Sequence, residues 1–84
     1  LVTVHKNELP ENDYNSILIA FDDENGIGVY SKFIDGYQLQ QFIENGTPIH
    51  YEEYFPYFDK KPVKMVAWAH SEKRGWAERI EHNI

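Results

Sequence analysis

Cysteine is absent from this chain of 84 residues. Disulfide bonds, zinc–thiolate sites and thiol catalysis are therefore excluded, because all three need a cysteine sulfur. A chain without disulfides and without a recognisable signal sequence is typical of the cytoplasm, and we expect a cytoplasmic protein of a bacterium or a host cell. Long hydrophobic runs are absent as well, and none approaches the roughly 20 residues of a membrane-spanning helix. We therefore expect no membrane association.

Basic residues are scarce. The chain has 8 Lys and Arg against 14 Asp and Glu, and its formal net charge is −6. The longest basic runs are the pairs Lys60-Lys61 and Lys73-Arg74. Nucleic-acid binding depends on neutralising phosphates with such side chains. Direct nucleic-acid binding is therefore not expected, and the charge instead suits solubility or a basic protein partner.

The motifs of common enzyme classes are missing. No G-x-S-x-G sequence marks a nucleophilic serine. The nearest approach to a phosphate-binding glycine loop, Gly26-Ile27-Gly28, falls at the start of an expected strand instead of before a helix. Hydrolase, kinase and dinucleotide-binding activities are therefore disfavoured. We predict that the chain is not an enzyme and has no cofactor.

Two groups of side chains offer the atoms that metal ions prefer. Asp22, Asp23 and Glu24 precede Gly26, but the pattern of a calcium-binding loop would need its first carboxylate at Phe21. An acidic, solvated turn is the better interpretation. The four histidines show none of the spacings of zinc sites. These histidines are His5, His50, His70 and His82. We predict no metal site.

A β-hairpin is the strongest structural prediction. Two apolar runs, Ser16 to Phe21 and Ile27 to Ile34, flank an acidic turn, Asp22 to Gly26, that ends in Asn-Gly. The first run is apolar at every position after its serine, a pattern typical of a central strand covered on both faces. The second run alternates, as expected of a strand with two different faces.

The remaining periodicity predicts an α+β fold. Residues 1–5 and 63–70 have the pattern of strands. Residues 37–45 place apolar side chains at helical spacing, and residues 76–84 could form a short helical turn. We predict a single domain, residues 1–84. In it, a small antiparallel sheet of three to four strands packs one face against one main helix, residues 37–45.

The segment from His50 to Phe58, HYEEYFPYF, is the compositional outlier. Large aromatic side chains with polar tips, next to carboxylates, are typical of protein interfaces. The alternative is that these rings fold under the loop and complete a small core. We predict a partner-binding surface here and leave core completion open. The predicted contact residues are Tyr51, Glu52, Glu53, Tyr54, Tyr57 and Phe58.

Parts of the chain resemble a family of small domains of unknown function encoded by phages and prophages. The matching parts are a strand leading into a Leu-Pro-Glu turn, a hairpin and a closing strand with a tryptophan. They correspond here to Val2, Val4, Leu9-Pro10-Glu11, Ile17 to Phe21, Gly26 to Gly36 and Ala67-Trp68. The chain departs from the family in lacking its opening tryptophan, in reading AWAHSE near the end, and in a longer insert, 37–61. The resemblance implies a bacterial or mobile-element setting and transfers no functional residues.

Together these features predict a small non-enzymatic accessory domain that acts by contact with an unidentified protein partner, in a phage, prophage or bacterium. One alternative is an acidic inhibitor that mimics nucleic acid. Another is a small metal-dependent enzyme that uses His50 or His70 with nearby carboxylates. A short sheet also has exposed edges that would permit a homo-oligomer by edge pairing, although nothing in the sequence selects this.

Overall fold

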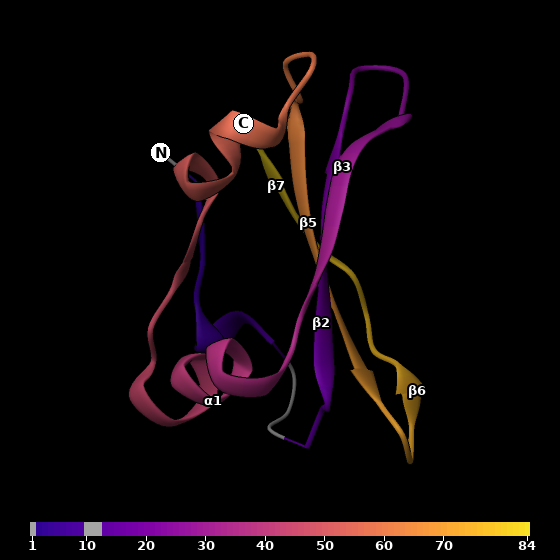
Figure 1. The fold of residues 1–84 in the computed structure, drawn as a ribbon. Helices are drawn as coiled ribbons and strands as arrows, with labels where there is room; N and C mark the ends of the chain where they lie inside the picture. The colour runs from indigo at the N-terminus through magenta and orange to yellow at the C-terminus, as the bar shows by residue number, and fades with distance from the viewer. Residues whose placement is uncertain (1, 10–12) are drawn as a thin grey trace.

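The computed structural model describes residues 2–9 and 13–84 and has two layers (Figure 1). One layer is a five-stranded antiparallel sheet in the order β3-β2-β5, with both β6 and β7 paired to β5. The other layer contains α1, the 3₁₀ helix η2 and the small β1–β4 ladder. The elements are β1 (Thr3–Val4), η1 (Lys6–Glu8), β2 (Ser16–Asp22), β3 (Gly28–Ile34), α1 (Gly36–Asn45), β4 (Ile49–His50), η2 (Tyr51–Tyr57), β5 (Lys64–Ser71), β6 (Gly75–Trp76) and β7 (Ile80–Asn83).

The predicted α+β fold with one main helix on one face of the sheet is confirmed. Leu39 and Phe42 of α1 are buried, and the helix ends at Gly46, whose φ of 68° is in the left-handed region that favours glycine. Beyond α1 the second layer contains η2, in the stretch 47–61 where the two prolines predict an irregular or partly helical connection with a turn around Tyr51 to Phe55. The predicted first strand is shorter than expected and pairs with β4 outside the main sheet. Leu1 and the Pro10-Glu11 part of the expected turn lie outside the described residues.

The prediction of three to four strands is wrong, because the sheet has five. The difference comes from the C-terminal segment, which forms β6 and β7 in place of a helical turn. Gly75, with a φ of 74°, closes a tight turn that folds β6 back on β5. The backbone amides of Lys73 and Arg74 donate to the Ser71 hydroxyl within this turn. A segment this short takes its structure from the backbone groups that an open strand edge offers it.

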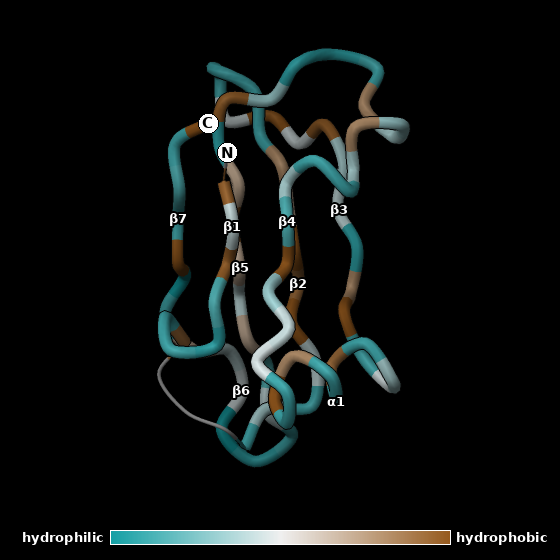
Figure 2. Tube along the Cα trace, turned by 90° about the vertical axis from the view of Figure 1, so that its left-hand side faces the viewer, coloured by the Kyte–Doolittle hydropathy of each residue, from teal (hydrophilic) through white to brown (hydrophobic). Residues whose placement is uncertain are grey.

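Strand β2 is central, as predicted, but only one of its faces is fully covered. It pairs with β3 on one side and with β5 on the other. Ile17, Ile19 and Phe21 are completely buried beneath the second layer, whereas Leu18 and Ala20 are partly exposed on the opposite face. Figure 2 shows this layering, with β1 and β4 in front of the hydrophobic stretches of β2 and β5. The expected cover on both faces is therefore absent from the described structure.

Aromatic rings close the core at one end of β2. The ring of Phe21 contacts those of Phe58, Tyr54, Tyr51 and Tyr30, with centroid distances of 4.9, 5.2, 6.0 and 6.5 Å. Two of these partners lie in η2 and one lies just after it, so Phe21 contacts this segment along most of its length, and Tyr30 of β3 adds further ring contacts to it. Burial of large rings is the main stabilising contribution available to a domain of this size.

The hairpin turn is organised by one carboxylate. The backbone amides of Asn25 and Ile27 both donate to Oδ1 of Asp23, each at 2.9 Å. Lys60 Nζ lies 3.4 Å from Oδ2 of the same residue. The hydrogen bond from Ile27 contributes most to a pKa of Asp23 that lies below its ordinary value of 3.8. The charged form of Asp23 therefore stabilises the turn.

Replacing Phe21 by alanine should unfold much of the domain. Loss of a fully buried phenylalanine costs about 3–5 kcal/mol, a large part of the stability that a small domain has. Urea denaturation of Phe21→Ala and of the control Tyr37→Ala, which removes a ring that is 75% exposed, would measure the difference. An unfolding midpoint of Phe21→Ala equal to that of the control would contradict the central place of this ring.

The loss of stability at acidic pH should depend in part on Asp23. Because its pKa in the folded chain lies below 3.8, the stabilisation is complete above that value and disappears as the pH falls through the folded pKa. Asp23→Asn keeps an acceptor oxygen for the two amides and removes the charge. We expect the melting temperature of this variant to fall less steeply between about pH 5 and pH 2 than that of the wild type. Identical pH profiles would refute the assignment.

Candidate functional site

The aromatic segment divides between the core and the surface. Tyr51 and Tyr54 are only 8% and 4% exposed and belong to the core around Phe21. Burial raises the pKa of Tyr54 above that of an ordinary tyrosine. These two predicted contact residues therefore complete the core, which was the alternative left open by the sequence.

The remaining predicted residues lie closer to solvent. Tyr57 is 59% exposed and its ring stacks on Tyr30 of β3, at 5.2 Å and an interplanar angle of 11°. Glu53 is exposed, whereas Glu52 and Phe58 are half-buried. The six residues are thus not one surface. What remains of them at the surface is Tyr57 with Glu53, beside the β3 edge and close to the exposed ring of Phe55.

Two of the histidines lie beside carboxylates, and the shorter contact joins Nε2 of His82 to Oε1 of Glu8 at 2.6 Å. Nδ1 of His50 lies 3.2 Å from the hydroxyl of Thr3 and 3.7 Å from a carboxylate oxygen of Glu52. His70 packs edge-on against the ring of Trp76 at 4.8 Å. Within residues 2–9 and 13–84 no group of three histidine or carboxylate side chains is placed to hold a metal ion.

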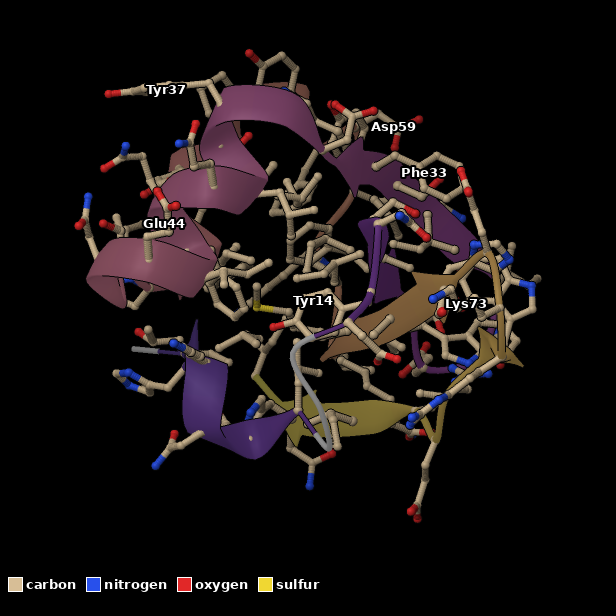
Figure 3. All side chains as sticks on the ribbon, turned by 90° about the horizontal axis from the view of Figure 1, so that it is seen from below. Tyr14, Phe33, Tyr37, Glu44, Asp59 and Lys73 are labelled. Carbon is tan, nitrogen blue, oxygen red and sulfur yellow. The ribbon has the colours of Figure 1, made fainter. Side chains whose placement is uncertain are left out.

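A second aromatic group lies on the outer face, which we define as the face of the sheet turned away from α1. Trp68 and Trp76 contact each other at 4.5 Å, and Phe33 contacts Trp76 at 6.4 Å. With His70, these rings form a row from β3 to β6, here called the aromatic row. Figure 3 shows Phe33 on the side of the sheet opposite Tyr37 and Glu44 of α1.

The aromatic row is held rigidly although it is exposed. The Trp68 indole donates to the backbone carbonyl of Ala77 at 2.6 Å, and the Arg79 guanidinium lies 5.5 Å from its ring centroid. Phe33 and Trp76 are 52% and 45% exposed. Fixed aromatic rings at a surface lose little conformational entropy on binding and are typical anchors of protein interfaces.

A pocket opens next to Trp76, toward the face of β5 that carries Ala69 and Ser71, which is opposite the face of Trp68 and His70. Its volume is about 260 Å³, and Tyr14, Ala69 and Ala77 contribute to its apolar wall. An ion pair between Asp13 and Arg74, at 3.3 Å, borders the pocket. A pocket of this size and polarity suits one large apolar side chain.

The charge of the chain is unevenly distributed around this surface. The strands of the sheet and the C-terminal hairpin contain no excess of acidic residues. The acidic residues are Asp22, Glu72, Glu78 and Glu81, and the basic residues are Lys32, Lys64, Lys73, Arg74 and Arg79. Lys64 pairs with Glu81 at 2.8 Å, and Arg79 lies 3.9 Å from Asp22. The pairing with Lys64 lowers the pKa of Glu81. The net charge of −6 therefore arises from the rest of the chain.

The aromatic row was not predicted from the sequence, for an identifiable reason. Trp68 and His70 are two residues apart in a predicted strand, which places them on the same face. Trp76 was assigned to a helical turn, and its position opposite His70 appears only once β6 pairs with β5. The usable signal was the turn-forming Gly75 between two aromatic-containing segments.

Comparisons of the chain with protein-family models, with curated protein sequences and with solved structures gave no match. The resemblance to the phage and prophage family therefore stays a prediction. No helix in the described part of the chain has the length and apolar character needed to cross a bilayer.

Two tyrosines of the 51–58 segment should respond differently to truncation. Tyr54→Ala removes a buried ring and should lower the free energy of unfolding by about 3 kcal/mol or more. Tyr57→Ala removes a largely exposed ring and should change it by less than about 1 kcal/mol, because its main contact is one stacked ring. Chemical denaturation of both variants measures the difference, and equal losses would contradict the division of this segment.

Proposed function

We propose that this chain is a small non-enzymatic accessory domain that binds a partner protein through the outer face of its sheet. The observation that carries the proposal is the aromatic row, in which two exposed rings are fixed by neighbouring side chains. Exposed apolar surface of this kind is a recurrent feature of interaction sites and is otherwise a liability for solubility.

The charge distribution supports the same surface. Desolvating unpaired charges opposes association, and interface centres are accordingly poor in net charge. Beside the row two ion pairs are already formed, Lys64 with Glu81 and Arg79 with Asp22, so that a partner covering the row leaves these four charges paired. We therefore place the binding energy at the outer face.

The setting we propose, a phage, prophage or bacterial cytoplasm, rests on the resemblance in the opening strand, the hairpin and the closing strand. Of the contact residues predicted in the 51–58 segment, Tyr57 and Glu53 are the exposed ones and remain candidates for a second, smaller contact.

The proposal is tested by a matched pair of double variants. Phe33→Ser with Trp76→Ser removes the exposed rings of the row, whereas Tyr37→Ser with Tyr57→Ser removes two rings of the second layer that are even more exposed. Immobilised protein would capture partners from a lysate of the source organism, with the bound proteins quantified by mass spectrometry. We expect the first variant to weaken capture by at least about tenfold and the second to leave it unchanged.

A purified partner can then be titrated directly. The chain contains 2 tryptophans, Trp68 and Trp76, and both lie in the aromatic row, so tryptophan emission reports on this surface alone. Binding at the row should shift the emission to shorter wavelength. A partner that binds tightly without any emission change, or that is lost only in the Tyr37 and Tyr57 variant, would assign function to the second layer instead.

A further inference from the structure

The side of β3 remote from β2 is an open edge of the sheet. In the described part of the chain β3 pairs with β2 alone, and the strand runs over the seven residues Gly28–Ile34 (Figure 1). A strand of this length has a row of unpaired backbone groups along its free side, which is a template for another strand.

The pairing pattern shows which backbone groups point outward. In antiparallel strands the residues alternate between bonding to one neighbour and bonding to the other. The amide of Ala77 donates to the carbonyl of Ala69 at 2.9 Å, so the odd-numbered residues of β5 bond away from β2. The even-numbered residues of β5 consequently bond to their even-numbered partners on β2, such as Trp68 to Leu18.

The odd-numbered residues of β2 therefore bond to β3. Their partners there include Lys32, which faces Ile19, and Tyr30, which faces Phe21. By alternation, the N–H and C=O groups of Val29, Ser31 and Phe33 point away from β2 at the free edge.

These three residues are arranged symmetrically about Ser31. If a second copy lies antiparallel with the two Ser31 residues opposite each other, Val29 of each copy faces Phe33 of the other. All three outward-pointing residues then form hydrogen-bonded pairs at once. On the outer face the apolar side chains of Val29 and Phe33 meet across the junction, and such cross-strand pairs stabilise sheets.

Lys32 discriminates between registers. A lysine on an edge strand normally opposes pairing, and the register centred on Lys32 would place two lysines directly opposite each other. In the register centred on Ser31, Lys32 instead faces Tyr30 of the second copy, whose ring is stacked on Tyr57. An ammonium group beside stacked tyrosine rings is a favourable cation–π arrangement.

The edge is also the stretch where two acidic chains can approach most easily. From Asn25 to Ile34 the sequence contains no acidic residue, and its single charge is that of Lys32. Elsewhere a chain of net charge −6 repels its own copy. A second copy therefore meets less repulsion along β3 than along the acidic remainder of the chain.

We propose that a second copy of this chain pairs with β3 through its own β3, in the antiparallel register centred on Ser31. The sheet then continues across both copies, and the two aromatic rows lie on one extended outer face. The contact uses the edge of the sheet and leaves Trp68, His70 and Trp76 free, whereas Phe33 takes part in both contacts, so the two proposals are separated by variants of Trp76 and Ser31 and not of Phe33.

A single cysteine tests the register directly, since the natural chain has none. In the proposed dimer the Cα atoms of the two residues 31 lie about 5.5 Å apart, within the range that a disulfide spans. Ser31→Cys should therefore form a covalent dimer under mild oxidation. Tyr37→Cys, at an exposed position of α1, is the matched control and should cross-link at the rate of random collision. Equal cross-linking rates would overturn the proposal.

A proline tests the edge. Ser31→Pro removes an outward-facing N–H and no hydrogen bond to β2, and edge strands tolerate proline at such a position. We expect the wild type and Ser31→Thr to sediment as dimers and Ser31→Pro to sediment as a monomer with an unchanged circular dichroism spectrum. A wild type that stays monomeric when its concentration is raised about tenfold through the micromolar range would refute the dimer. A Ser31→Pro protein that still dimerises would refute pairing through the β3 edge.

The two proposals fail separately. Trp76→Ser lies outside the β3 edge, so it should abolish capture of the partner protein and leave the dimer intact. Ser31→Pro should do the opposite, or weaken capture only through loss of bivalency. Loss of the dimer in Trp76→Ser would show that the copies associate through the outer face and would overturn pairing along β3.

Discussion

The packing of aromatic rings around Phe21 is the interaction on which the rest of the structure depends. This side chain belongs to the central strand β2, and its partners come from β3, from η2 and from the residue after η2. It therefore joins the two layers at the end of the sheet remote from α1. A domain of 84 residues buries a smaller share of its surface than a larger one, so the loss of one large buried ring removes a large part of its stability.

One consequence of this packing is that the two faces of the sheet become chemically different. The second layer is large enough to cover one face. Tyr51 and Tyr54 are buried in that core and are therefore unavailable for binding a partner. The opposite face keeps exposed rings at Phe33 and Trp76, which contact each other, and Trp76 also contacts Trp68, whose indole is hydrogen-bonded to Ala77. Opposite charges are paired there, whereas the net negative charge lies elsewhere. Core formation on one side thus leaves the aromatic row exposed on the other.

Local pattern was sufficient for the hairpin, for α1 and for β5, because each of these has a strong periodicity and clear turn residues at its ends. The C-terminal segment was mispredicted because a four-residue apolar spacing also occurs in short strands, and the available edge of β5 decides between the two. The sequence also did not show that Tyr51 and Tyr54 are buried while Tyr57 is exposed. Burial in a 3₁₀ helix depends on which of its sides packs against β2. The aromatic row needed the pairing of His70 with Trp76, which joins two sides of a turn.

The sequence by itself determined the fold class, the central position of β2, the acidic charge and the absence of thiol chemistry, because these follow from composition and short-range periodicity. Only the tertiary structure decided the number of strands, which aromatic rings serve the core, and which rings remain at the surface. The physical reason is that burial and edge pairing are properties of residues far apart in the chain. Phe33 and Trp76 are far apart in the sequence and come into contact only in the folded sheet.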